Sequence, residues 1–169
     1  NMTVDIGLVP NMSIGSLVFL DNNANGVFDA GDSGLAGNEV NLLTDLNGDG
    51  VIDPSEVLTT TVTSINGTYF FGNLLPGQYQ VSVPNPPSAT PYSSPVAVTD
   101  TNDNQQDNDD NGVQIDGAGT LVLSPIITLS PGVEPGVEPG IGGANDDTAE
   151  TNGDMTVDFG FYQVASLGN

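Results

Sequence analysis

The sequence has no lysine, arginine, histidine or cysteine among its 169 residues, although it contains 22 aspartates and glutamates. Its formal net charge is −22, so no ion pair can form between its side chains. Because like charges oppose a compact state, a folded form of this chain needs bound counterions, and divalent cations are the obvious remedy. The missing basic residues exclude nucleic acid as a partner, since phosphates are bound through Lys or Arg. The missing cysteines exclude disulfides.

The same absences argue against an enzyme. Without His, Cys or Lys, the common nucleophile, general-base and Schiff-base arrangements cannot be built, and only carboxylate chemistry remains. The clustered acids are better explained as metal ligands than as a catalytic pair. We therefore expect no catalytic activity.

Long apolar runs are also missing, and the sequence shows neither a signal peptide nor an initiating Met. We interpret the chain as an excerpt of a longer exported polypeptide. An extracellular location, at the cell surface or secreted, also fits weak calcium sites that fill only at high calcium.

The two ends of the chain carry the same sequence. NMTVDIGLVPNMSIGS (residues 1–16) aligns without a gap on DMTVDFGFYQVASLGN (residues 154–169), so Met2 matches Met155 at an offset of 153 residues. A constant offset is typical of tandem repetition. We predict that residues 1–12 are the closing strand of a preceding repeat, residues 13–163 one repeat, and residues 164–169 the start of the next. Two alternatives stay open: similar strands within one sandwich, and a strand exchanged between neighbouring copies.

Strand patterns dominate the chain, and no window longer than ten residues supports a helix. The fold class we predict is all-β, an immunoglobulin-like or prealbumin-like Greek-key sandwich. The expected core includes Tyr79, Val81 and Val83 on one strand and Val157, Phe159 and Phe161 on another. The clearest hairpin surrounds Asn66-Gly67. The expected strands are Ser13–Leu20, Glu39–Thr44, Val57–Ser64, Thr68–Phe71, Gln78–Val83, Pro95–Thr99, Gly112–Ile115, Thr120–Leu129 with a break at Pro125, and Met155–Tyr162.

Two segments match the twelve-residue calcium-loop pattern, in which oxygen donors alternate and Gly at position six allows a sharp turn. A hard cation takes six to eight oxygens, which this alternation supplies. The predicted ligands of the first loop, DNNANGVFDAGD, are Asp21, Asn23, Asn25, the Val27 carbonyl, Asp29 and Asp32. Those of the second, DLNGDGVIDPSE, are Asp45, Asn47, Asp49, the Val51 carbonyl, Asp53 and Glu56. The alternative is a pair of polar turns without metal.

Two further acidic segments lack the loop spacing. DTNDNQQDNDDNG (residues 100–112) offers ligands for one or two more ions, or is a solvated loop; its candidates are Asp100, Asp103, Asp107, Asp109 and Asp110. PGVEPGVEPGIGG (residues 131–143) is expected to be a long surface loop, because its prolines cannot donate to a strand ladder. Its glutamates Glu134 and Glu138 are either cation ligands or part of a solvated arm.

Taken together, the segments SIGSLVFLDNNANGVFDAGD, GTYFFGNLLPGQYQVSV and MTVDFGFY resemble the B-repeats of serine-aspartate-repeat surface adhesins, which are related to collagen-adhesin B-type domains. The resemblance covers nearly all of residues 13–162. It implies a β-sandwich with calcium in its loops and a stalk role in tandem arrays on bacterial surfaces. The isopeptide crosslink of some relatives needs Lys, which this chain lacks.

The function we predict is a structural repeat of a calcium-stiffened extracellular fibre or adhesin stalk, with neighbouring copies as its partners. The alternative is a module that binds a glycan or protein through bridging calcium. No aromatic cluster beside the loops supports that alternative.

Overall fold

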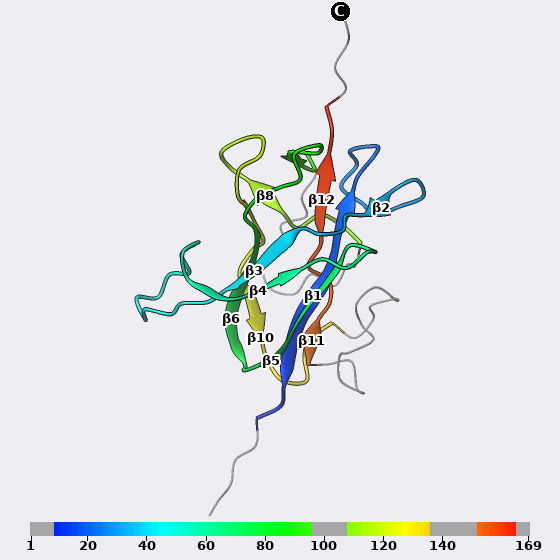
Figure 1. The fold of residues 1–169 in the computed structure, drawn as a ribbon. Coiled ribbons are helices and arrows are strands. Elements are labelled where there is room, and N and C mark those ends of the chain that lie inside the picture. Colours follow the sequence, from blue (N-terminus) through cyan, green and yellow to red (C-terminus); the bar gives the residue numbers. More distant parts are fainter. Residues whose placement is uncertain (1–8, 96–107, 136–151, 165–169) are drawn as a thin grey trace, which may run out of the picture.

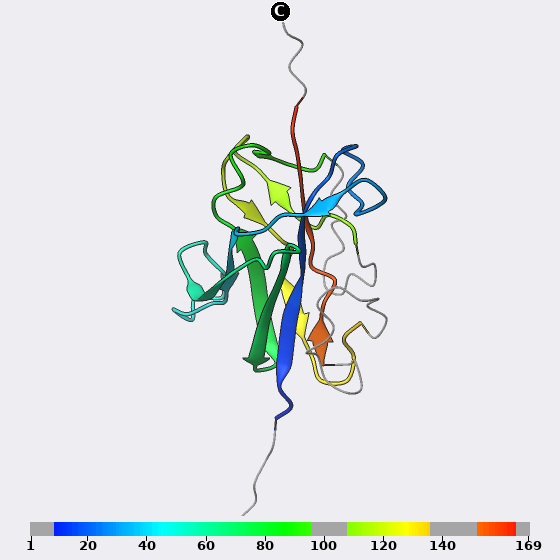
Figure 2. The ribbon, with the colours of Figure 1, turned by 45° about the vertical axis from the view of Figure 1, so that its right-hand side comes forward.

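The computed structural model describes residues 9–95, 108–135 and 152–164, and all regular elements in these ranges are strands. They form two six-stranded sheets that pack as a sandwich (Figures 1 and 2). One sheet holds β1 (Met12–Leu20), β2 (Ser33–Gly34), β5 (Thr68–Leu74), β7 (Tyr92–Ser93), β11 (Gly153–Asp154) and β12 (Phe159–Tyr162). The other holds β3 (Glu39–Leu43), β4 (Val57–Val62), β6 (Gly77–Val83), β8 (Val113–Gln114), β9 (Val122–Leu123) and β10 (Ile127–Leu129). The predicted all-β sandwich is confirmed. The described residues contain no helix suited to crossing a membrane.

The core lies between the sheets and follows the predicted alternation. Tyr79, Val81 and Val83 point inward from β6, and all three are buried. Val157, Phe159 and Phe161 are buried in the same cluster. Successive strand residues face opposite sides of a sheet, so the period-two pattern was sufficient to locate these core positions.

β1 is the central strand of its sheet. It pairs in parallel with β11 and β12, and antiparallel with β5 and β2. Met12–Leu17 pair with β5, and pairing with β12 begins at Val18; Ser16, whose φ is 143°, lies just before this point. Eight of its nine residues are buried, because the strand is covered by neighbours along its whole length.

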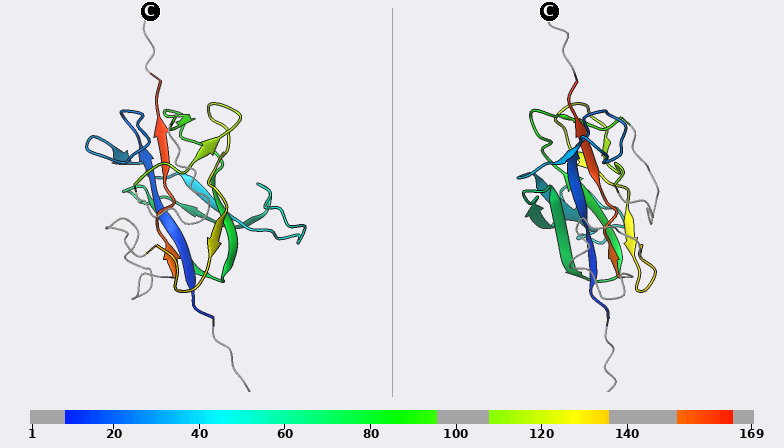
Figure 3. Two further views of the ribbon diagram at one scale, coloured as in Figure 1. Left: turned by 180° about the vertical axis from the view of Figure 1, so that it is seen from behind. Right: turned by 90° about the vertical axis from the view of Figure 1, so that its right-hand side faces the viewer.

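The parallel pairing of β1 with β12 makes the chain enter and leave the sandwich at opposite ends (Figures 1 and 3). We call these the N-terminal end and the C-terminal end. The β5–β6 turn and the loop after β10 lie at the N-terminal end. The loop after β1 and the β8–β9 loop lie at the C-terminal end.

The predicted hairpin around Asn66-Gly67 is wrong as a strand pair. The turn forms, with Gly67 at φ 83° and the Ser64 N–H donating to the Thr68 carbonyl at 2.8 Å. However, β4 pairs with β3 and β5 pairs with β1, so the turn carries the chain from one sheet to the other. A Cβ added at Gly34 would overlap the Asn66 carbonyl, so β2 packs tightly against this corner.

Most other strand boundaries agree within a few residues, with two exceptions. The segment Met155–Tyr162 is a regular strand only from Phe159 onward, and the short β11 precedes it. β2 and β7 have two residues each and were not predicted. The expected strand Pro95–Thr99 lies outside the described residues after Pro95, as do residues 136–143 of the PGVE segment.

Candidate metal-binding loops

The two predicted calcium loops occupy different parts of the molecule. The loop of residues 21–32 follows β1 at the C-terminal end of the sandwich (Figure 1). The loop of residues 45–56 joins β3 to β4 and projects sideways from the body of the sandwich (Figure 3). Each therefore begins where a strand ends, so an ion bound there would hold strand ends in place.

Both loops close on themselves through their acidic side chains. The carboxylate at position one accepts the N–H groups of positions five and six, and the carboxylate at position twelve accepts those of positions two and nine. In the first loop, Asn25 and Gly26 N–H donate to Asp21 (3.2 and 2.9 Å), and Asn22 and Asp29 N–H donate to Asp32 (2.9 and 3.0 Å). In the second, Asp49 and Gly50 N–H donate to Asp45 (3.2 and 2.8 Å), and Leu46 and Asp53 N–H donate to Glu56 (3.0 and 2.9 Å).

The amide and acid side chains at positions three and five complete the same pattern. In each loop the position-three oxygen accepts the position-five N–H, and the position-five oxygen accepts the position-seven N–H. Gly26 and Gly50, at position six, have φ of 78° and 87°, which favours glycine. Two loops of different sequence thus share one conformation, with their oxygen-bearing side chains turned toward the loop backbone.

The loops differ in burial. Asp21 is buried, whereas Asp45 is partly exposed. In the second loop the buried acid is Glu56 at the other end. The N–H of Gly50, assisted by those of the neighbouring residues, lowers the pKa of Asp45. The position-one carboxylate of the second loop is therefore held in its ionised form, which is the form that binds a cation.

The structure brings part of the third acidic segment onto the first loop. Asp109 forms an antiparallel bridge with Val27, and the Asp110 N–H donates to the Gly26 carbonyl at 2.8 Å. The Phe28 N–H donates to the Asn108 carbonyl at 2.7 Å. Asp109 and Asp110 are buried beside the loop. The other candidates of this segment, Asp100, Asp103 and Asp107, lie outside the described residues.

Asp110 connects this segment to the last strand. Its Oδ1 accepts the N–H groups of Gly112 and Gly160, both at 2.9 Å. Burial raises the pKa of Asp110 well above its usual value, and the nearby charge of Asp21 adds to this effect. Because Asp21 and Asp110 are both buried and the chain has no basic residue, uncompensated negative charge is unfavourable in this region.

Two residues absent from the predicted ligand set also belong to this region. Ser94 donates its hydroxyl to Asp21 Oδ2 at 2.5 Å. Asp158 is completely buried and accepts the Asn108 N–H at 2.8 Å. The available signal for Asp158 was its match to Asp5 in the other copy of the repeated sequence, together with its place among apolar strand residues.

The donor set fits a hard cation in its chemistry, since it consists only of carboxylate, amide and carbonyl oxygens. Within the described ranges, no three acidic side chains converge as a finished metal cage. An ion in either loop would therefore take oxygens that now accept loop N–H groups, including those of the side chains at positions three and five. The two loops are thus closed rings of oxygen donors that a cation would reorganise locally.

The model of the SdrD B-like domain matches residues 12–124, about two thirds of the chain. The chain belongs to this family. The matched residues contain both twelve-residue loops and the Asn108–Gly112 segment, and they end before β10. The strands that complete the sandwich, including β12, and the buried Asp158 that precedes it, lie beyond them.

Two curated proteins are similar to this SdrD B-like domain. Colossin-A of Dictyostelium discoideum is 42% identical over 94 residues, which is 56% of this chain and 1% of that protein. Serine-aspartate repeat-containing protein C of Staphylococcus aureus (strain Newman) is 34% identical over 118 residues, which is 69% of this chain and 11% of that protein. The chain thus spans a small fraction of the length of either relative.

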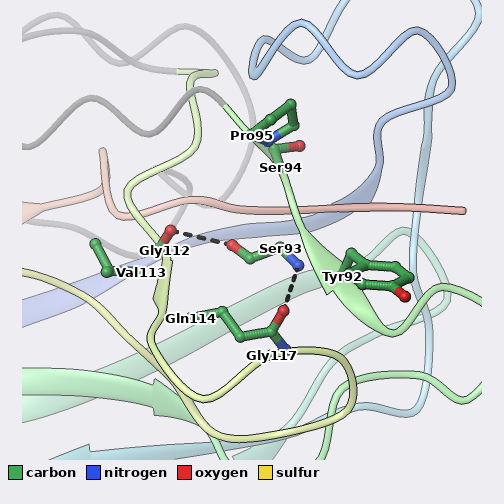
Figure 4. A pocket seen from close by; sticks show the side chains of 8 residues that line it. All are labelled: Tyr92, Ser93, Ser94, Pro95, Gly112, Val113, Gln114 and Gly117. Carbon is green, nitrogen blue, oxygen red and sulfur yellow. Dashed lines mark hydrogen bonds between the residues drawn. The ribbon is translucent and has the colours of Figure 1, made fainter. Parts of the chain in front are cut away.

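A pocket of about 370 Å³ lies between β7 and β8 of the SdrD B-like domain (Figure 4). Its wall includes Gln114, whose amide accepts the Ser93 N–H at 3.1 Å and donates to the carbonyls of Pro91 and Thr120, both at 3.0 Å. None of its eight lining residues is acidic. Two of its lining residues, Ser93 and Ser94, donate their hydroxyls to Asp110 and Asp21, so the pocket lies beside the first loop, although its own lining offers no carboxylate to a cation.

Proposed function

We propose that this domain is a structural repeat of an extracellular fibre or adhesin stalk, and that calcium in its two twelve-residue loops stiffens it. The observation that carries this proposal is the shared conformation of the loops, in which equivalent acids and amides line both rings. Membership of the SdrD B-like family supports a structural rather than a catalytic role.

The charge of the loops supports calcium as the ligand. The first loop holds three carboxylates and the second holds four, and the whole chain has no basic residue to balance them. A divalent cation in each loop would offset this charge where it is most concentrated. Calcium accepts the mixed set of carboxylate, amide and carbonyl oxygens that the loops present, in a flexible geometry.

The two sites would act on different parts of the fold. The first loop contacts residues 108–110 and, through Asp21 and Ser94, the strand β12 region, so an ion there ties together segments far apart in the sequence. The second loop closes the connection between β3 and β4, where the Thr44 N–H donates to the Glu56 carbonyl at 3.3 Å. Loss of calcium from the first loop is therefore expected to weaken the whole sandwich, and loss from the second only that connection.

Chelation tests this proposal. The thermal unfolding of the chain is followed by calorimetry in about 1 mM calcium, which equals the weakest dissociation constants of extracellular calcium modules. The measurement is repeated after the metal has been removed with EDTA. We expect EDTA to lower the melting temperature and re-added calcium to restore it, while magnesium restores it poorly because magnesium demands a stricter octahedral geometry. An unfolding curve that is the same with and without calcium would refute the calcium role.

The alternative function, a module that binds a glycan or protein through bridging calcium, predicts a different result. If calcium in the loops bridges to an external glycan, a glycan array should show binding that chelator abolishes. We favour the stalk because the acids of both loops accept hydrogen bonds from their own backbone rather than forming an open, ligand-facing surface.

A further inference from the structure

The repeated sequence fixes how closely two copies of this domain can follow each other. With the offset of 153 residues, Met12, which begins β1, corresponds to residue 165. β12 ends at Tyr162, so only Gln163 and Val164 separate it from the β1 of a following copy. The three Cα steps between these strands span at most about 11 Å. The facing ends of consecutive copies in an array therefore lie close together.

The direction of the strands decides which surfaces meet. Because β1 and β12 run in parallel, the chain leaves at the C-terminal end of one copy and enters the N-terminal end of the next (Figures 1 and 3). The C-terminal end of one copy must therefore face the N-terminal end of its successor.

Each of these ends exposes large apolar side chains. At the C-terminal end, Ile115 in the β8–β9 loop is 78% exposed, and Val27 in the first metal loop is also exposed. At the N-terminal end, Leu75 in the β5–β6 turn is 65% exposed, and Val133 in the loop after β10 is also exposed. Burial of such side chains is favourable, at roughly 25 cal/mol for each Å² removed from water.

The charges of the two ends are compatible with contact. At the C-terminal end, Asp29 and Asp116 are exposed. Among the described residues at the N-terminal end, the acids Glu134 and Asp154 are buried, and the exposed polar groups include the amide of Asn11. Among the described residues, an acidic end therefore meets a surface whose named acids are buried, which reduces the repulsion that two acidic surfaces would produce.

We infer that consecutive copies pack directly end to end, with the Ile115 end of one copy against the Leu75 end of the next, so that neighbouring domains stabilise each other. This inference rests on the proposed role as a repeat in a tandem array. It adds an interaction surface whose partner is a second copy of this chain.

The test uses a doubled chain, in which residues 1–164 are followed directly by residues 12–169, so that the two-residue junction is preserved. In calcium, we expect the doubled chain to unfold in one transition at a higher temperature than the single chain. Placing Ile115→Ser in the first copy and Leu75→Ser in the second, at the junction, should return the transition to the temperature of the single chain.

The matched control moves the same two substitutions to the free ends, with Leu75→Ser in the first copy and Ile115→Ser in the second. This variant has the same composition, and we expect it to unfold like the unsubstituted doubled chain. Ile65→Ser is a second control, since Ile65 is 84% exposed but lies at the β4–β5 corner away from both ends.

Equal unfolding of the junction and free-end variants would overturn the inference, as would a doubled chain that melts like the single one. The effect of EDTA on the single chain is measured separately. Failure of the calcium proposal would thus appear in the single chain, and failure of domain packing only in the doubled one.

Discussion

The carboxylate of Asp158 accepts the backbone N–H of Leu17 at 2.9 Å, at the point where β1 exchanges β5 for β12 as its neighbour. The other oxygen of the same carboxylate accepts the Asn108 N–H at 2.8 Å. One buried side chain therefore joins the first strand, the start of the last strand and the acidic segment that lies against the loop of residues 21–32.

Replacement of Asp158 by Asn should destabilise the fold. Asparagine presents one oxygen and one N–H₂ group, so it can satisfy only one of the two N–H donors and leaves the other buried without an acceptor. We expect a loss of about 2 kcal/mol, seen as a fall of roughly 4–8 °C in melting temperature. The exposed Asp116→Asn is the control and should melt within a degree or so of the wild type. A melting temperature of Asp158→Asn equal to that of this control would contradict the bridging role.

Asp49→Ala should reduce the stabilisation by calcium. Asp49 is at position five of the second loop, where its carboxylate is a proposed ligand, and it is exposed, so its removal costs little packing. The quantity measured is the difference in melting temperature with and without calcium. We expect this difference to shrink for Asp49→Ala. It should stay unchanged for Asp116→Ala, because Asp116 lies outside the two twelve-residue loops. Equal differences in both variants would remove Asp49 from the ligand set.

The hydroxyl of Tyr69 should make stability fall at alkaline pH. It is buried and donates to the Val157 carbonyl at 2.6 Å. Burial, and then the charges of Asp158 and Asp154, raise the pKa of Tyr69 well above 10.0. The folded state therefore keeps this proton more tightly than the unfolded state, so the contribution of Tyr69 is complete below about pH 10 and decreases as the pH rises further.

Tyr69→Phe tests this dependence. At neutral pH it should cost about 1–2 kcal/mol, because the Val157 carbonyl loses its buried partner. Above about pH 10 the gap between the two proteins should narrow, since only the wild type has this proton to lose. Urea unfolding at pH 7 and pH 11 measures both values, and a constant gap would show that Tyr69 does not contribute to the alkaline loss.

Ser16→Gly should stabilise the protein. Ser16 is buried, its φ of 143° is unfavourable for a residue with a Cβ, and its hydroxyl finds no hydrogen-bond partner among the described residues. Relief of backbone strain is worth about 1–3 kcal/mol, against roughly 0.5–1 kcal/mol for the greater freedom of glycine in the unfolded chain. Ser16→Ala removes only the hydroxyl and should gain less. The order of melting temperatures, Gly above Ala above Ser, checks the argument.

The conformation of the two twelve-residue loops was predictable because their pattern is local. Twelve consecutive residues specify where each oxygen lies, and Gly26 and Gly50 supply the turn, so the sequence alone places the donors along each ring. The core was predictable for the same reason, since Val81 and Phe159 follow a period of two along their strands. Occupancy of the loops by calcium stays a prediction.

The region around Asp158 was not predictable, because it depends on contacts between distant residues. Nothing near Asn108 in the sequence indicates that its N–H meets a carboxylate 50 residues away. The Asn66-Gly67 turn failed for a related reason. The residues of the turn determine that the chain reverses there. They do not determine that β4 and β5, on either side of the turn, belong to different sheets, with Gly34 packed against the turn.

The parallel arrangement of β1 and β12 also determines how the domain responds to tension. A pull on the two ends of the chain acts along both strands in opposite directions, so it slides them past each other instead of peeling them apart. The Val18–Phe159 and Leu20–Phe161 pairs and the Asp158 bond to Leu17 then bear the load together and must fail together. A domain built in this way resists traction along its axis better than a hairpin that opens one bond at a time.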